Sequence, residues 1–205
     1  MHSIYRSAAG NFERRTGMRK RSDVLEFSIL GLLHDSPLHG YELRKRLTGV
    51  LGPFRAISYG SLYPALKDLL ARGLISEATG SDEQPLATRR ARIVYELTAD
   101  GKERFEALVA QPGPEAWEDE PFAAHFAFFG RTPAEVRMRI LEGRRSRLEE
   151  RLSTLRDSFA RAGQRLDDYT EQLHQHGLDS VEREVRWLGE LIDSESKTTR
   201  ENKQK

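Results

Sequence analysis

The side chains best suited to chemistry in this sequence are hydroxyl groups gathered at the start of one predicted helix. Ser58 and Ser61 flank Gly60, and the phenols of Tyr59 and Tyr63 lie in the same short stretch. The N–H groups at a helix N-terminus favour phosphate, and hydroxyl groups can bond to phosphate or to base edges. Gly60 also permits a close approach of the backbone to a ligand. The stretch therefore indicates a surface that binds nucleic acid.

Each of these residues also has a purely structural interpretation. One of the two serines is expected to cap the helix, and Tyr63 could pack in the core instead of contacting DNA. Lys67 lies one turn after Tyr63 and could reach a phosphate, but a lone lysine indicates nothing. Arg89 and Arg90 could form a solvated loop, as a charged pair usually does. The interpretation depends on whether the surrounding elements bring these residues together.

The elements predicted in the first half of the chain have recognisable start and stop signals. They are helices over about residues 23–36, 39–47, 58–72 and 99–109, and strands over about residues 74–78 and 92–97. Asp23 should cap the first helix, which is apolar on nearly every side and belongs in the core. Tyr41 is expected mainly in the core, and the glycines and proline of residues 49–53 predict a break. Gly73 should stop the third helix, and Thr98 should cap the fourth.

The order of these elements is helix, helix, helix, strand, loop, strand, helix. In a winged helix-turn-helix the third helix enters the major groove, and the hairpin, or wing, reaches the DNA backbone beside it. A helix in that position needs one face that packs on the core and one face that can approach DNA. The predicted third helix has both, because it combines an apolar back with a front of small and polar residues. We therefore predict a mainly α fold with a small β-hairpin, comprising a winged helix-turn-helix and a C-terminal helical dimerisation domain.

The second half of the chain is dominated by one long helix with a heptad pattern. Thr132 should cap it, Gly177 should end it, and a last helix is expected over about residues 179–193. Apolar residues that recur every seven positions are typical of a coiled coil or a bundle helix. They could pack on the last helix, but they extend further than one short helix covers, so a dimer is favoured. The predicted dimer contacts are Leu141, Leu148, Leu152, Leu155, Phe159, Leu166, Tyr169, Leu173 and Leu188.

Composition and motifs exclude several classes of function. The 33 basic and 32 acidic residues nearly balance, but basic residues cluster within residues 14–21 and 89–92. The chain has no cysteine and no apolar run of membrane-spanning length, so a cytoplasmic protein is the simplest interpretation. We find no phosphate-binding glycine loop, nucleophile elbow or HExxH zinc motif. A single Glu171-x-x-His174 lacks the second motif of a di-iron bundle. An enzyme, a metal site and a cofactor are therefore not expected.

Five segments follow from these patterns. They are a disordered arm at residues 1–17, the winged helix-turn-helix at 18–110, a linker and aromatic segment at 111–132, the helical dimerisation domain at 133–195 and a tail at 196–205. Aromatic side chains of the third segment could line a pocket for a small-molecule effector, although a role in the core is favoured. These side chains are Trp117, Phe122, Phe126 and Phe129. The alternative function is a helical scaffold that binds only protein, which would have no need of a two-faced third helix.

Several spaced segments carry a resemblance to a known family. Residues 39–43 (HGYEL), 60–66 (GSLYPAL) and 94–98 (VYELT) resemble the PadR family of bacterial transcriptional regulators, and the match covers about residues 23–107. The C-terminal part resembles the larger PadR subfamily, whose C-terminal helices dimerise. The resemblance implies a homodimer that represses genes by binding an inverted repeat in double-stranded DNA. It also implies release by a ligand, often an aromatic or drug-like compound.

Carried over residue by residue, the resemblance also places Pro64 on the recognition helix. The predicted DNA contacts are then Ser58, Tyr59, Gly60, Ser61, Tyr63, Pro64, Lys67, Arg89 and Arg90. The wing departs from the family pattern in two ways. Its loop over residues 80–90 looks long, and residues 91–94 replace the usual basic-aromatic pair. Contacts from the wing are therefore less firmly implied than contacts from the helix.

Overall fold

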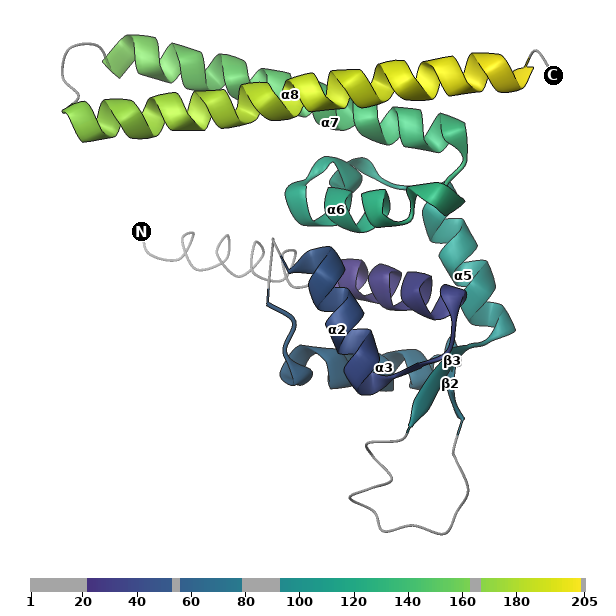
Figure 1. Cartoon of the computed structure of the whole chain (residues 1–205). Coiled ribbons are helices and arrows are strands. Elements are labelled where there is room, and N and C mark those ends of the chain that lie inside the picture. Colours follow the sequence, from purple (N-terminus) through teal and green to yellow (C-terminus); the bar gives the residue numbers. More distant parts are fainter. Residues whose placement is uncertain (1–21, 53–55, 79–92, 163–166, 204–205) are drawn as a thin grey trace, which may run out of the picture. The chain divides into compact units, whose positions relative to one another are not determined.

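The computed structural model of the chain describes residues 22–52, 56–78, 93–162 and 167–203 (Figure 1). The chain divides into two compact units. The first comprises Met1–Gln111 and Ala123–Gly130, and the second comprises Pro112–Phe122 and Arg131–Lys205. No helix among the described residues is long and apolar enough to span a membrane.

The first unit is a set of helices around a small antiparallel sheet. A helix over residues 22–35 is followed by β1 (Leu38–His39), α2 (Gly40–Leu51), α3 (Tyr59–Ala71), β2 (Ile75–Ala78), β3 (Val94–Leu97) and α5 (Ala99–Ala110). The strand order is β1-β3-β2, and β3 pairs with both neighbours in antiparallel register. The mainly α fold with a β-hairpin is confirmed. The extra strand β1 was not predicted, because two residues are too few to show an alternating pattern.

The helix over residues 22–35 lies in the core, as its apolar sequence predicted. Ile29 and Leu30 have no exposed surface, and Gly31 lies directly against the ring of Phe128. A Cβ atom added to Gly31 would come within 2.4 Å of that ring, so only glycine fits there. Ser22 is already helical, so the prediction that Asp23 is the N-cap residue was wrong.

The helix α2 is longer than predicted and presents a different face. It continues through Gly49 to Leu51, so the predicted break begins too early. A glycine inside a helix costs only about 1 kcal/mol, and Leu51 is completely buried, so packing outweighs propensity. Leu43 and Leu47 occupy the inward face with no exposed surface. Tyr41 lies on the opposite side and is 67% exposed, which contradicts its predicted place in the core.

Both ends of α3 are fixed by local backbone chemistry. Ser58 is the N-cap residue, and Gly73 adopts a φ of +69° just after the helix. The amide N–H groups of Gly73 and Leu74 donate to the carbonyl oxygens of Leu70 and Leu69. This is the Schellman arrangement, which satisfies the last carbonyls of a helix and requires the left-handed conformation that glycine tolerates. The predicted stop at Gly73 is therefore confirmed.

The C-terminal end of α3 is also held by an ion-pair network centred on Glu26. The Glu26 carboxylate accepts hydrogen bonds from Arg72 at 2.7 and 3.1 Å and from Arg104 at 3.1 Å. Burial alone would raise the pKa of Glu26, but these hydrogen bonds and the two positive charges hold the pKa below its usual value. The network joins three helices of the first unit: the helix over residues 22–35, α3 and α5.

The second unit is dominated by two long helices. It contains η1 (Pro114–Trp117), part of α6 (Asp119–Ala127), α7 (Ala134–Ala162) and α8 (Asp168–Lys203), and the short η2 (Phe129–Arg131) precedes α7. Residues 111–132, predicted as a linker, are therefore largely helical. In Figure 1, α7 and α8 run side by side in opposite directions, and Arg156 on α7 donates to Glu182 on α8 at 2.6 Å.

The predicted position of the helix break was wrong. The long helix ends at Ala162, and α8 passes through Gly177 without interruption. An antiparallel hairpin lets each long helix bury its own apolar stripe against the other, which a single helix ending at Gly177 would not allow. Leu141 and Leu148 on α7 and Leu188 on α8 are buried within the chain in this way. The predicted seam therefore packs, at least over these residues, intramolecularly.

A buried arginine ties the short helices of the second unit to the long ones. The side chain of Arg144, on α7, is only 4% exposed and donates to the carbonyl oxygen of Trp117 and to the carboxylates of Asp119 and Glu184. Its guanidinium carbon lies 4.5 Å from the ring centroid of Phe122. One carbonyl oxygen, two carboxylates and one aromatic ring therefore compensate for the loss of water around the charge.

We predict that Glu26→Gln lowers the free energy of unfolding by about 1–2 kcal/mol at pH 7, because Arg72 and Arg104 lose their charged partner. The folded-state pKa of Glu26 is lowered, so its contribution is present above the usual value of 4.5 and is lost as the pH falls through the folded-state pKa. Denaturant titrations should show a difference between wild type and variant that shrinks below about pH 4.5.

The control is Asp68→Asn, which removes the exposed second partner of Arg72. Because exposed ion pairs contribute little, the control should change stability by less than about 0.5 kcal/mol. Equal effects of the two variants, or a Glu26→Gln effect that does not depend on pH, would contradict the network's role.

Candidate nucleic-acid interface

The first turn of α3 is built around two serines with different tasks. Ser58 accepts a hydrogen bond from the amide N–H of Ser61 at 3.3 Å, so Ser58 is the capping residue of the two. The hydroxyl of Ser61 donates back to the carbonyl oxygen of Ser58 at 2.9 Å. The hydroxyl oxygens lie 3.4 Å apart, and Ser58 is exposed. The turn thus presents a small, polar, exposed surface at the positive end of the helix dipole.

Two tyrosines stand side by side on the outer face of α3. Tyr59 and Tyr63 are 42% and 46% exposed, and their rings stack with centroids 5.7 Å apart and planes at 21°. The sequence left open whether Tyr63 packs in the core or is exposed, and in the structure it is exposed. The opposite face of α3 carries Leu62, Leu66 and Leu69, each at most 1% exposed. The helix is therefore two-faced, as the sequence predicted.

Gly60 and Pro64 leave the front of α3 unusually open. A Cβ atom added to Gly60 would meet nothing closer than the Ser58 hydroxyl oxygen at 3.6 Å, so the fold itself does not demand glycine there. Pro64 lies inside the helix and has no N–H to donate to the carbonyl of Gly60. A carbonyl acceptor and a bare backbone are therefore both available on the exposed side of the helix. Lys67 is exposed one turn further on.

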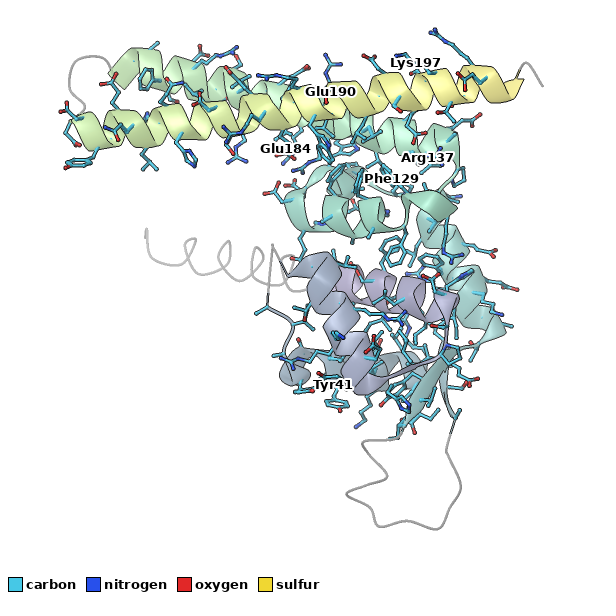
Figure 2. The ribbon with its side chains drawn as sticks, in the orientation of Figure 1. Tyr41, Phe129, Arg137, Glu184, Glu190 and Lys197 are labelled. Atoms are coloured by element: carbon cyan, nitrogen blue, oxygen red, sulfur yellow. The ribbon has the colours of Figure 1, made fainter. Side chains whose placement is uncertain are left out.

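Residues of α2 border this surface, and sequence analysis did not assign them to it. The Tyr63 hydroxyl lies 3.7 Å from the position of a Cβ atom on Gly40, so the start of α2 is adjacent to α3. Tyr41, labelled in Figure 2, is exposed on this part of α2. Lys45 is exposed one turn later on the same side. The four-residue spacing of Tyr41 and Lys45 is the signal in the sequence that indicates this surface, but it is masked by the prediction of Tyr41 in the core.

The sheet approaches Tyr63 through Tyr95, since both side chains lie close to Gly40. Tyr95 on β3 is buried and pairs with Leu38 and Glu77 across the sheet. Burial, together with the nearby Glu77 carboxylate and Tyr63, raises the pKa of Tyr95 to about 12. Tyr95 is therefore a neutral phenol at physiological pH. Arg89 and Arg90, predicted on the wing, lie outside the described residues.

The residues predicted at the dimer contact fall into different environments. Leu141, Leu148, Leu152 and Leu188 are buried within the second unit, and Leu155 and Phe159 are half-buried. Tyr169 and Leu173, in the first turns of α8, are 85% and 68% exposed. Leu166 lies outside the described residues. Of the predicted contact residues that the structure describes, Tyr169 and Leu173 are therefore the ones left exposed for a partner.

The four aromatic residues predicted at an effector pocket do not share one environment. Phe122 is buried beneath Trp187 and Arg144 in the second unit. Trp117, in the same unit, borders a groove of about 420 Å³ that Arg147 and Arg151 also line. Phe126 and Phe129 belong to the first unit, where their rings lie 4.9 Å apart. Within the described part of the chain, no cluster of three or more histidine or acidic side chains is arranged to hold a metal ion.

The first unit matches a family of known regulators in sequence. Residues 29–107 match the transcriptional regulator PadR-like family. The negative transcriptional regulator PadR of Bacillus subtilis (strain 168) is 33% identical over 99 residues, which cover 47% of this chain and 52% of the relative. The match therefore spans about half the length of that relative.

Solved structures of PadR are similar along more of the chain. Bacillus subtilis PadR in complex with operator DNA is 25% identical, with a TM-score of 0.39, over 84% of this chain and 99% of that one. The same regulator in complex with p-coumaric acid is 24% identical, with a TM-score of 0.38 and the same coverage. Both TM-scores lie below 0.5, so the likeness that counts is the one in sequence. Over residues 29–107, the chain is similar to the PadR-like family of transcriptional regulators.

Proposed function

We propose that this regulator binds an inverted repeat in double-stranded DNA as a homodimer and represses transcription from it. The observation that carries the proposal is the exposed front of α3, where Tyr59 and Tyr63 lie beside Gly60 and the two serines of the first turn. A winged helix-turn-helix inserts its third helix into the major groove, and α3 holds that place in the element order. The back of α3 is fully buried, so the front is free to face DNA.

The chemistry of this surface fits a division between base contacts and phosphate contacts. Tyr59 and Tyr63 offer hydroxyl groups and flat apolar faces, which suit base edges and thymine methyl groups. The N-terminal amides of α3 and the Ser58 hydroxyl suit a phosphate, and Lys67 adds a positive charge one turn later. The predicted phosphate contacts of Arg89 and Arg90 remain part of the proposal.

Dimerisation is supported by the apolar surface that the second unit leaves exposed. Tyr169 and Leu173 lie four residues apart, so they share one face of α8. Both would be buried if a second copy packed on this face. Two recognition helices of such a dimer would be placed about 34 Å apart, one turn of DNA. This symmetry is what makes an inverted repeat the expected operator.

Repression is supported by the relative in Bacillus subtilis, which is named a negative transcriptional regulator.

Release by a small-molecule effector is part of the same proposal. Phe122 is already covered by Trp187 and Arg144, so we place the effector contact at Trp117 rather than at Phe122. The competing function is a scaffold that binds only protein, and sequence-selective DNA binding distinguishes the two.

We predict that the full chain selects a palindromic duplex from a random pool. The variant Tyr63→Ala should bind this duplex about 10- to 100-fold more weakly, because a base contact contributes roughly 1–3 kcal/mol. Lys67→Ala should weaken selected and unrelated duplexes equally and reduce the salt dependence of binding, because it removes a phosphate contact. Fluorescence anisotropy titrations at several salt concentrations measure both effects.

The matched control is Lys197→Ala, which removes an equally exposed lysine from α8. It should leave both affinities unchanged. A wild-type chain that binds no duplex selectively at low salt would favour the scaffold, and a Tyr63→Ala variant with wild-type selectivity would remove α3 from base contact.

We predict that the wild-type chain is a dimer at micromolar concentration. The double variant Tyr169→Ser/Leu173→Ser should have a dimer dissociation constant at least about tenfold higher, because burying the two apolar side chains favours association. Sedimentation velocity over a range of concentrations measures this. Gln172→Ser, at a neighbouring exposed position, is the control and should leave the dimer intact. A wild type that stays monomeric at micromolar concentration would contradict the proposed assembly.

A further inference from the structure

Arg44 on α2 makes two contacts at the start of α3, one with Tyr59 and one with Ile57, which precedes the N-cap residue. Its Nε–H donates to the carbonyl oxygen of Ile57 at 3.0 Å. Its guanidinium carbon lies 4.4 Å from the ring centroid of Tyr59. Because Tyr59 stacks on Tyr63, three flat groups form a continuous layer, in the order Arg44, Tyr59, Tyr63. This layer is called the Arg44 stack below.

Both contacts lie at the N-terminus of α3, next to its N-cap residue Ser58. Ile57 is buried and directly precedes the capping residue Ser58, so the bond to its carbonyl fixes the chain as it enters the helix. Tyr59 is the first residue of α3, and its ring is otherwise half exposed. An exposed side chain at a helix start normally samples several rotamers, and ordering it on binding costs free energy. Arg44 restrains Tyr59 before any ligand arrives.

We propose that Arg44 is a positioning residue for sequence recognition: it holds Tyr59, and through it Tyr63, in the orientation in which they contact bases. The inference rests on the proposed function of the first unit as a DNA-binding domain. It assigns to α2 a part in specificity that does not require α2 to touch a base. It also explains why two neighbouring exposed tyrosines share one stacked arrangement.

The side-chain type matters, because arginine does both tasks at once and lysine does not. Its planar guanidinium stacks on an aromatic ring while Nε–H donates within the same plane. A lysine would keep the positive charge but has no planar group and no Nε–H. Arg44→Lys therefore separates positioning from simple attraction to phosphate. Arg46 supplies a matched control, since it lies on the same helix and pairs with Glu42 on its own surface.

The experiment compares wild type, Arg44→Lys and Arg46→Lys, all as full-length chains. Affinities are measured for the selected duplex and for an unrelated duplex at several salt concentrations. We expect Arg44→Lys to bind the selected duplex about tenfold more weakly, while its affinity for the unrelated duplex and its salt dependence stay at the wild-type level. Arg46→Lys should behave as wild type in every titration.

A second measurement uses no DNA. Ring-proton NMR signals of Tyr59 should be shifted by the stack in the wild type and in Arg46→Lys. In Arg44→Lys they should move toward the values of free tyrosine, with the melting temperature of the first unit within a few degrees of wild type. Tyr59 signals that do not respond to Arg44→Lys would overturn the restraint that the inference requires.

The failures can be told apart. A wild type that does not discriminate between the duplexes overturns the proposed function and the inference with it. A wild type that discriminates, with Arg44→Lys discriminating equally well, overturns the inference alone. Equal weakening for both duplexes would also overturn it, because that result identifies Arg44 as a general DNA contact rather than a positioning residue.

Discussion

The burial of one face of α3 is the constraint on which the first unit depends. Leu62, Leu66 and Leu69 have almost no exposed surface, and each buried leucine contributes about 1.5–3 kcal/mol relative to exposure. Their burial fixes the rotation of α3 about its own axis. The opposite face, with Tyr59 and Tyr63, must then point away from the core. Rotating the helix would expose the leucines, so the presentation of the tyrosines follows from the packing behind them.

The two ends of α3 are secured by different means, which together restrict its position. At the C-terminal end, Gly73 closes the helix and Arg72 is bound to Glu26. At the N-terminal end, Ser58 caps the helix and Arg44 binds the carbonyl of the preceding residue. A helix held at both ends and along its back loses little conformational entropy when it binds a ligand. This preorganisation favours affinity as well as specificity.

Much of this arrangement could be predicted from local sequence signals, and the exceptions have physical causes. A cap at Ser58 or Ser61, the stop at Gly73 and the apolar back of α3 depend on neighbouring residues, so they are visible in the sequence. The exposure of Tyr41 depends on which residues of α2 face the core, which is a tertiary property. The contact of Arg44 with the Ile57 carbonyl joins positions 13 apart and involves the backbone, which leaves no pattern in residue types. Gly177 lies inside α8 because packing between two long helices outweighs the small helix propensity of glycine.

The central claim is that the tyrosine face of α3 is the surface that DNA covers. Residue-resolved nitration of tyrosines, measured by mass spectrometry with and without the selected duplex, tests it most directly. The buried Tyr95 serves as an internal reference within the same chain. The account predicts that DNA protects Tyr59 and Tyr63 while the modification of Tyr95 stays unchanged. Unprotected Tyr59 and Tyr63 in a chain that is bound to DNA would contradict it.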